Sequence, residues 1–328
     1  MKSFQYLFLV VALLGCQAEP NLKKVPKPVI NKVEKGLNNV SFNPAVDILF
    51  IIDDSGSMSR YQEKLAANAD LFIEKFFKAK FIDFHIGVTS SSTQSNLSKA
   101  GDGKLHRVDK ETFVERTTPD KEILLAEMMN IGTSGSGTER FLNVPELTFG
   151  KTLVTGFNKG FYRPNAQLAI IVVTDTEDQS RVTPDEAYEF VLELKNNENT
   201  KIHYVAAVIE QNASCPQTDD YKAGPRKLKA MMDFFDNRGH QLDLCKANYG
   251  EDMARIAEGL VKAVSTIYLD ELPDITTLKV AYGNIIIPND PITGWVYNAE
   301  ENAIVLSPNI DIQDQDLQQL KITFESVY

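Results

Sequence analysis

Residues 46–267 alternate between short apolar runs and longer stretches with helical spacing. The runs at 46–52 and 168–173 are apolar almost throughout, which is typical of strands buried on both faces of a parallel sheet. Thr183 followed by Pro184 marks a helix start, as an N-cap residue and a first-turn proline. The remaining pattern predicts strands at 82–89, 202–209 and 242–245, a hairpin around 101–103, and helices at 60–79, 120–130, 225–236 and 251–267. This alternation predicts a doubly wound, mostly parallel α/β sheet of the Rossmann-like kind.

Residues 268–328 follow a second pattern, which lacks helical spacing. Short strands are expected at 278–282, 285–287, 295–297, 303–306 and 320–324, separated by Gly, Pro and Asn. In the last of these, Leu320, Ile322 and Phe324 alternate with polar residues, which predicts one buried face and one wet face. The single Trp295 is expected in the core rather than as a platform for a ligand. The segment is therefore predicted to be a small C-terminal all-β module.

The first 15 residues have the pattern of a signal peptide. Lys2 precedes an apolar stretch at 4–14 that is too short for a stable transmembrane helix. The stretch ends in Leu13-Leu14-Gly15-Cys16, which resembles the bacterial lipobox. The resemblance implies cleavage before Cys16 and acylation of its thiol, and several acyl chains make a durable anchor. With Gln17 after the cysteine, the resemblance to sorted lipoproteins also implies delivery to the outer membrane, since aspartate at that position is the usual inner-membrane retention signal. The alternative is an ordinary secretory peptide followed by a free cysteine.

Residues 16–45 are predicted to form a lipidated tether. Five lysines lie there among prolines and asparagines, with little apolar periodicity. A flexible segment of this length spans roughly 30 Å. Its lysines are expected to be solvated, with contact to anionic lipid as the alternative. The predicted organisation is a signal peptide at 1–15, the tether at 16–45, an α/β domain at 46–267 and the β module at 268–328.

Composition and cysteine content narrow the function classes. The net charge of −11 argues against nucleic-acid binding, because that role needs clustered Lys and Arg. In an exported chain, Cys215 and Cys245 remain as a pair once Cys16 is set aside, so a disulfide is expected. It would close a loop of about 30 residues and contribute about 3–4 kcal/mol. The alternative, a metal site, would have only two thiolates as ligands.

The motifs of common enzyme classes are absent from the sequence. The four histidines show no His-Glu-x-x-His spacing, and none accompanies a Gly-x-Ser-x-Gly elbow. No P-loop or dinucleotide-binding glycine motif occurs. The protein is therefore expected not to be an enzyme, and a metal-activated water is the remaining route to hydrolysis.

The first apolar run ends in Asp53-Asp54-Ser55-Gly56-Ser57-Met58. This places polar residues at the carboxyl edge of the predicted sheet, where open α/β folds bind ligands. Asp53, Ser55 and Ser57 alternate, and their oxygens are the hard ligands that Mg²⁺ or Mn²⁺ prefers. Taken alone, the string fits a metal site and a helix cap equally well.

Two later segments change that balance. Residues 135–140 form a Gly-rich loop that contains Thr138, and the second apolar run is followed by Thr174 and Asp175. Together with the Asp-x-Ser-x-Ser string, these pieces resemble the metal-ion-dependent adhesion site of von Willebrand factor A (vWA) domains. The resemblance covers about residues 45–267, with the three pieces in the family's order and at strand ends.

The resemblance implies one bound divalent cation, with Mg²⁺ expected and Mn²⁺ or Ca²⁺ as alternatives. Its five ligands would be Asp53, Ser55, Ser57, Thr138 and Asp175. The hydroxyls would contact the ion directly or nearly so, and the two aspartates would hold it, often through water. A carboxylate from a partner would complete the octahedron. The family's strand order also implies that the two aspartates face each other where the order reverses.

Other acidic residues near the motif have roles that the sequence leaves open. Asp54 is expected to face solvent, and Glu139 is expected to complement a helix N-terminus. Glu177 and Asp178 are candidates for a ligand-specificity loop. The alternative for this pair is a solvated loop whose side chains cap a helix.

The leading functional hypothesis is a metal-dependent adhesion lipoprotein that recognises an acidic group on a protein or glycan partner. It would be attached by its N-terminal lipid to the outer membrane, facing either the periplasm or the exterior. One alternative is a structural or assembly factor of an envelope complex, and a further one is a metal-dependent hydrolase.

Overall fold

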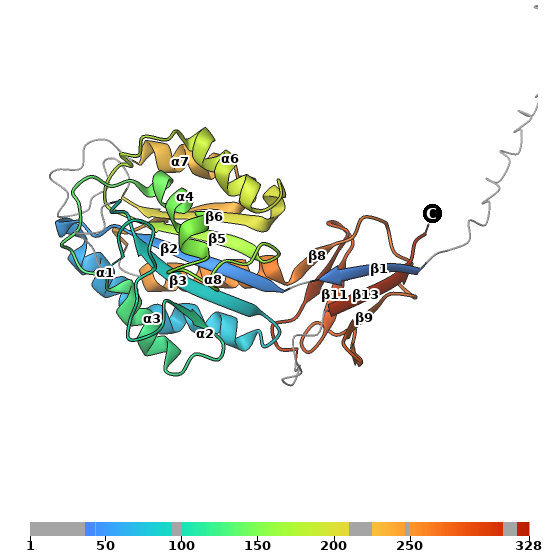
Figure 1. Ribbon diagram of the computed structural model, residues 1–328. Helices are drawn as coiled ribbons and strands as arrows, with labels where there is room; N and C mark the ends of the chain where they lie inside the picture. Colours follow the sequence, from blue (N-terminus) through green and yellow to red (C-terminus); the bar gives the residue numbers. More distant parts are fainter. Residues whose placement is uncertain are drawn as a thin grey trace, which may run out of the picture. The chain divides into compact units, whose positions relative to one another are not determined.

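The protein is built around a six-stranded, mostly parallel sheet with helices (Figure 1). The computed structural model describes residues 37–42, 44–93, 100–209, 225–246, 249–310 and 320–327. Across the sheet the strands are β4 (Phe113–Glu115), β3 (Asp83–Ser90), β2 (Ala45–Ile52), β5 (Gln167–Val173), β6 (Ile202–Val208) and β7 (Gly239–Asp243). Within this sheet only β4 runs antiparallel to its neighbour. The predicted mixed α/β character is confirmed.

Strand β2 lies near the centre of the sheet. Strands β3 and β4 lie on one side of it, and strands β5, β6 and β7 lie on the other. Its last residue, Ile52, is level with Ser90 of β3 on one side and with Val173 of β5 on the other. The residues that follow these strands therefore emerge together at the carboxyl edge of the sheet, where the strand order reverses.

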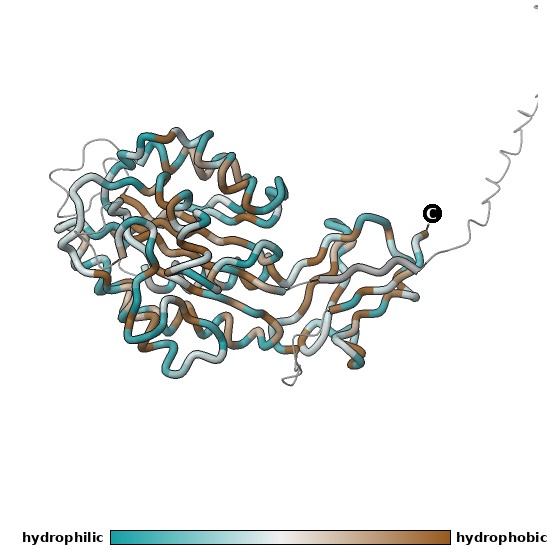
Figure 2. Tube along the Cα trace, viewed as in Figure 1, coloured by the Kyte–Doolittle hydropathy of each residue, from teal (hydrophilic) through white to brown (hydrophobic). Residues whose placement is uncertain are grey.

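Helices cover both faces of the sheet (Figure 1). In β2, Phe50 and Ile52 belong to one buried cluster and Leu49 and Ile51 to another, because successive side chains of a strand point to opposite faces. The first cluster includes side chains of α1 (Ser59–Ala66), α2 (Ala69–Lys78), α3 (Lys121–Met129) and α8 (Tyr249–Val264). The second includes side chains of α4 (Val144–Thr148), α6 (Pro184–Leu194) and α7 (Arg226–Asp233). The strands between them are predominantly hydrophobic (Figure 2).

Several elements differ from the sequence prediction. The helix expected at 60–79 is two helices, because Asn68 breaks it: its side-chain amide donates to the carbonyl of Lys64 and so ends α1. Residues 101–103 form a tight turn with positive φ at Asp102 and Gly103, and the described residues beside it form no hairpin. The short strand β4 and the helices α4 and α5 (Lys151–Val154) were not predicted. The described residues of this domain also contain four 3₁₀ turns, which are η1 (Gly56–Met58), η2 (Phe141–Asn143), η3 (Asn199–Lys201) and η4 (Asp236–Arg238).

Among the described residues, the C-terminal strands and β1 form two small antiparallel sheets. One has the order β1-β13-β9-β10, and the other has the order β11-β12-β8. The strands are β1 (Leu37–Phe42), β8 (Thr266–Tyr268), β9 (Lys279–Tyr282), β10 (Ile285–Ile287), β11 (Trp295–Asn298), β12 (Ala303–Leu306) and β13 (Leu320–Glu325). Trp295 is buried, and Leu320, Ile322 and Phe324 alternate with more exposed residues, as predicted.

The prediction of a tether over residues 16–45 is wrong at its C-terminal end. Residues 37–42 form β1, which pairs along its whole length with β13. The sequence signal was hidden because the strand lies next to the lysine- and proline-rich segment and its pairing partner lies almost 300 residues later in the chain. Residues 37–42 are therefore part of the β module.

Candidate functional site

The polar residues after β2 form the floor of the candidate site. Asp53 is fully buried, and its Oδ1 accepts a hydrogen bond of 2.8 Å from the backbone N–H of Ser55. Its Oδ2 accepts one of 2.7 Å from the hydroxyl of Thr174, which follows β5. Gln62 of α1 donates to the Asp53 carbonyl and to the Gly132 carbonyl, so it ties the next loop to this strand end. The two neighbouring strands thus fix the Asp53 carboxyl from both sides.

The rim of the site is formed by hydroxyls and a second aspartate. The hydroxyls of Ser55 and Ser57 are 3.2 Å apart, and Ser57 donates a hydrogen bond of 3.1 Å to Asp175 Oδ1. Ser57 is exposed, whereas Asp175 is partly buried. Four of the five residues named by the resemblance are therefore brought together, with the buried Asp53 below and Ser57 open to solvent.

The fifth residue, Thr138, is not part of this cluster. Its side chain is exposed and makes no hydrogen bond to the other four described residues. The next residue, Glu139, is buried instead, and its Oε2 accepts a hydrogen bond from the hydroxyl of Ser91 at the end of β3. The prediction that Glu139 complements a helix N-terminus is wrong, because its carboxyl group accepts a hydrogen bond from Ser91 at the end of β3.

Asp54 is also buried, which corrects the prediction that it faces solvent. Its Oδ1 accepts a hydrogen bond of 2.8 Å from Ser92 and lies 3.4 Å from the hydroxyl of Ser91. Gly135 lies against it so closely that a Cβ there would come within 2.3 Å of the carboxylate atoms. The three hydroxyls at residues 90–92 were the available sequence signal for this second carboxyl cluster.

Ser91 cannot satisfy both carboxyl groups that it approaches. A hydroxyl has a single proton, and it is shared here between Glu139 and Asp54. Asp54 Oδ2 and Glu139 Oε1 are buried and have no hydrogen-bond partner among the described residues. Buried oxygens of this kind are costly unless a proton or a cation satisfies them.

The pKa values of the carboxyl groups at the site are raised. Burial raises the pKa of Asp53 to about 6, and burial together with the nearby Asp53 charge raises the pKa of Glu139 to about 8. Burial also raises the pKa of Asp175, against which Arg60 acts as a cationic neighbour. The site is therefore short of positive charge around its acidic groups.

The donor set fits a hard divalent cation. Carboxylate and hydroxyl oxygens from two segments, residues 53–57 and 174–175, surround the strand ends, and these are the ligands of Mg²⁺, Mn²⁺ and Ca²⁺. No described group of three or more His, Cys, Asp or Glu side chains is arranged to hold a metal ion. Two aspartates and the serine hydroxyls would therefore coordinate an ion here. The Asp54 and Glu139 oxygens that have no hydrogen-bond partner among the described residues would lie nearby.

Glu177 and Asp178 both accept hydrogen bonds from other parts of the fold. Glu177 accepts hydrogen bonds from the backbone N–H groups of Arg226 and Lys227 at the start of α7. Asp178 is buried, accepts from Leu142 and Ser180, and lies 3.5 Å from Lys227 Nζ. Glu177 thus caps α7, as in the helix-capping alternative, whereas Asp178 is buried and not solvated. The role of the pair in ligand specificity stays a prediction.

Two further predicted residues lie outside the described part of the chain. These are the lipidation site Cys16 and the disulfide partner Cys215. Cys245, in the described segment after β7, is disulfide-bonded. The pairing with Cys215 stays a prediction.

Comparison with known proteins gives structural matches only. No family model matches the chain, and no curated protein matches it. Its structure is similar to the pilus adhesin SpaC from Lactobacillus rhamnosus GG in the open conformation, with a TM-score of 0.41 and 12% identity over 88% of this chain and 41% of the adhesin. It is also similar to proximal thread matrix protein 1 from the mussel byssus, with a TM-score of 0.36 and 10% identity over 71% of this chain and 51% of that protein. The chain thus spans about two fifths of the adhesin, and similarity at this level assigns neither a family nor an activity.

Proposed function

We propose that the protein is a metal-dependent binding protein of the cell envelope, with a doubly wound sheet of the vWA kind. The observation that carries the proposal is the hydrogen bond from Ser57 to Asp175, which joins segments 118 residues apart beside the buried Asp53. A hydroxyl string after one central strand and an aspartate after the next thus meet at the point where ligands bind in open α/β sheets.

Asp53, Ser55, Ser57 and Asp175 would hold one divalent cation, with Mg²⁺ expected and Mn²⁺ or Ca²⁺ as alternatives. Thr138 is the further ligand that the vWA resemblance implies, and Glu139, on which the charges of Asp53 and Asp175 act, is a nearby carboxyl group. A cation would offset the mutual repulsion of these buried acids. When bound, it would supply a Lewis-acidic position for an anionic oxygen of a partner.

The proposed partner is a protein or glycan that presents an acidic group to the exposed rim of the site. Ser57 lies at this rim, so an incoming carboxylate would meet the metal without entering the core. The residues around the site are expected to serve binding rather than turnover.

Thermal unfolding with and without metal tests the proposal. Mg²⁺ or Mn²⁺ should raise the melting temperature of the wild type, and a ligand at 100 times its Kd stabilises by about 2.7 kcal/mol. Asp53→Ala and Ser57→Ala should lose most of this gain, whereas Ser59→Ala, which removes an exposed hydroxyl two residues further on, should keep it. If neither Mg²⁺, Mn²⁺ nor Ca²⁺ shifts the transition up to about 10 mM, and partner capture survives chelation, the proposal is wrong.

The proposed location is the outer membrane, through a lipid on Cys16. No helix in the described part of the chain is long and apolar enough to cross a membrane. Cys16→Ser should release the protein from sedimented membranes. Retention of this variant through detergent-free washing would contradict the lipid anchor.

A further inference from the structure

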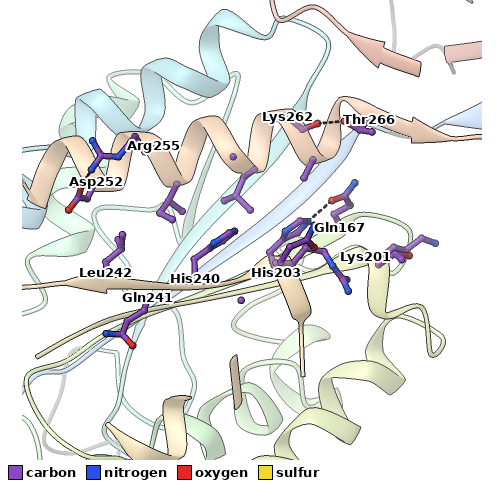
Figure 3. A pocket seen from close by; sticks show the side chains of 18 of the residues that line it. Gln167, Lys201, His203, His240, Gln241, Leu242, Asp252, Arg255, Lys262 and Thr266 are labelled. Carbon is purple, nitrogen blue, oxygen red and sulfur yellow. Dashed lines mark hydrogen bonds and ion pairs between the residues drawn. The ribbon is translucent and has the colours of Figure 1, made fainter. Parts of the chain in front are cut away.

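A cavity of about 980 Å³ lies between strands β6 and β7 and helix α8 (Figure 3). Much of its polar lining is already paired: His203 Nε2 is 3.0 Å from Gln167 Oε1. Three of its basic residues form ion pairs, which are Lys201–Glu198, Arg238–Asp236 and Arg255–Asp252. The described residues therefore give this cavity no charge or hydrogen-bonding pattern that selects a ligand.

Three exposed apolar side chains lie together at one end of the β module. Leu272, Ile275 and Val327 are 43%, 56% and 48% exposed. The Val327 N–H donates to the Leu272 carbonyl, and Pro273 forms an antiparallel bridge with Ser326. Leu272 and Val327 are therefore directly opposite each other, with their side chains on the same face of the pair. We call these three residues the apolar tip, and such a patch favours an apolar partner.

Ile275 is held outward by a hydrogen-bonded turn. Asp274 Oδ1 accepts from the N–H and the hydroxyl of Thr276, at 3.0 and 2.7 Å. The Thr277 hydroxyl donates to the Asp274 carbonyl and accepts from the N–H of Glu325 on β13. The turn is thus fastened to the sheet, and a partner would meet the exposed isoleucine without first having to order the turn.

The chain enters the β module at this same end. Leu37, the first described residue, is the Cα partner of Glu325, two residues before Val327. Figure 1 shows the start of β1 beside the end of β13. Only residues 17–36 separate this point from Cys16. A chain of this length reaches about 70 Å at most and about 25 Å as a random coil. A lipid on Cys16 would therefore keep the apolar tip close to the membrane.

The polar groups around the apolar tip are acidic. Glu271 is exposed, Glu325 is partly exposed, and the Asp274 carboxyl group takes part in the turn. An anionic surface would be repelled by these groups, whereas apolar burial needs no opposite charge. The surroundings therefore favour contact with the apolar part of a neutral bilayer.

We infer that the apolar tip docks on the lipid bilayer that carries the Cys16 anchor. Leu272, Ile275 and Val327 would enter the boundary between headgroups and acyl chains. The inference rests on the proposed lipid anchor, because a short tether supplies an effective concentration on the order of millimolar. A contact too weak to bind the free protein then suffices. Docking would orient the β module with the start of β1 toward the membrane.

Tryptophan quenching on vesicles tests this contact. The chain carries a hexahistidine tag in place of residues 1–16 and is bound to nickel-chelating lipid in dioleoylphosphatidylcholine vesicles, so acylation in the cell does not affect the result. Trp295 is buried and supplies a constant background. The emission added by Ile275→Trp should fall about twofold or more when lipid brominated on its acyl chains replaces ordinary lipid.

The matched control is Ile123→Trp on α3, where the isoleucine is 63% exposed. Its added emission should change by less than about a tenth, because tryptophan at a surface away from the anchor has no bilayer to enter. Equal quenching of the two variants, or no quenching of Ile275→Trp, overturns the inference.

Acidic substitutions show whether the apolar tip acts as a unit. Adding Leu272→Asp and Val327→Asp to Ile275→Trp should remove most of the quenching, whereas Leu147→Asp on α4 should not. These positions are exposed, and far-UV circular dichroism checks that the variants fold. Unchanged quenching contradicts the inference. Association of the untethered chain in sedimentation velocity that Val327→Asp abolishes would assign the apolar tip to a second copy instead. Membrane retention of Cys16→Ser in cells would count against the native anchor alone.

Discussion

Glu139 is the residue whose role the structure changes most. The vWA resemblance directs attention to the hydroxyl of Thr138, but the side chain that reaches the strand ends is its neighbour. Glu139 contacts Ser91, and the charges of Asp53 and Asp54 act on it. A carboxyl group buried among other carboxyl groups favours either a proton or a cation, so its titration reports on what occupies the site.

Without metal, Glu139 should make stability fall as pH rises. Its pKa is about 8 in the folded protein and near 4.5 when unfolded, so the folded state binds more protons between these values. The resulting loss of stability between pH 5 and pH 8.5 should be on the order of 4 kcal/mol. Glu139→Gln should flatten this dependence in urea unfolding at pH 5 to 9 in EDTA, while Glu300→Gln at an exposed position should not. An unchanged pH profile in Glu139→Gln would mean that the group is ionised throughout.

Asp178 should matter for stability and not for metal affinity. Replacement by alanine removes the acceptor for the buried backbone N–H of Leu142 and for Ser180. The cost should be about 2–3 kcal/mol, because a buried donor is left unsatisfied. The midpoint of a Mg²⁺ titration should stay within about twofold of wild type. A variant with normal stability and weakened partner binding would instead support the specificity-loop hypothesis.

At the scale of single elements, the clearest local signal is the start of α6. Thr183 accepts a hydrogen bond from the Glu186 backbone N–H, and Glu186 accepts one back from Thr183, which forms a capping box. Thr183→Ala should therefore cost about 1 kcal/mol in urea unfolding. Thr152→Ala, at an exposed position of α5, should change stability by less than about 0.5 kcal/mol. Equal effects of the two substitutions would mean that the capping box does not contribute.

Elements were predictable where one local signal dominated. The buried strands β2 and β5 and the start of α6 follow from apolar runs and from Thr183-Pro184. The break at Asn68 was not predictable, because the apolar spacing continues across it and only a side-chain hydrogen bond ends α1. Strand β7 begins earlier than expected, at Gly239, because pairing with β6 stabilises residues that have no apolar pattern of their own.

The candidate site was predictable to the extent that its residues follow strands directly. Asp53, Ser55, Ser57 and Asp175 occupy strand ends, and strand order brings them together. Loop residues carry no such constraint, so the choice between Thr138 and Glu139 depends on the path of the loop. That path is set by long-range contacts, such as the hydrogen bond from the Ser136 backbone to Ser92, which no local pattern encodes.

At the scale of the whole molecule, the disulfide of Cys245 is expected to stabilise the segment after β6. With Cys215 as its partner, the bond would close a loop of about 30 residues and contribute about 3–4 kcal/mol. Reduction should lower the melting temperature by roughly 10 °C. Peptide mapping without reductant should recover Cys215 linked to Cys245, and Cys245→Ser should be insensitive to reductant. Recovery of both thiols in the free form would contradict the pairing.

Strand β1 pairs with β13 near the C-terminus, so truncation should show whether residues 37–42 act as a tether or as a structural strand. A chain that begins at Gly36 keeps all six paired residues, whereas one that begins at Pro44 lacks them. Because β13 would then lose its hydrogen-bonded neighbour on one side, the shorter chain should be less stable by on the order of 3 kcal/mol.

The exposed edge of β13 should also promote association between copies, since unpaired strand edges recruit other strands. Urea unfolding and sedimentation velocity of the two truncated chains measure both effects. Equal stability and equal monomer content would mean that residues 37–42 serve only as part of the tether. A difference confined to the chain starting at Pro44 would establish them as part of the fold, because the two chains share every residue from 44 onward.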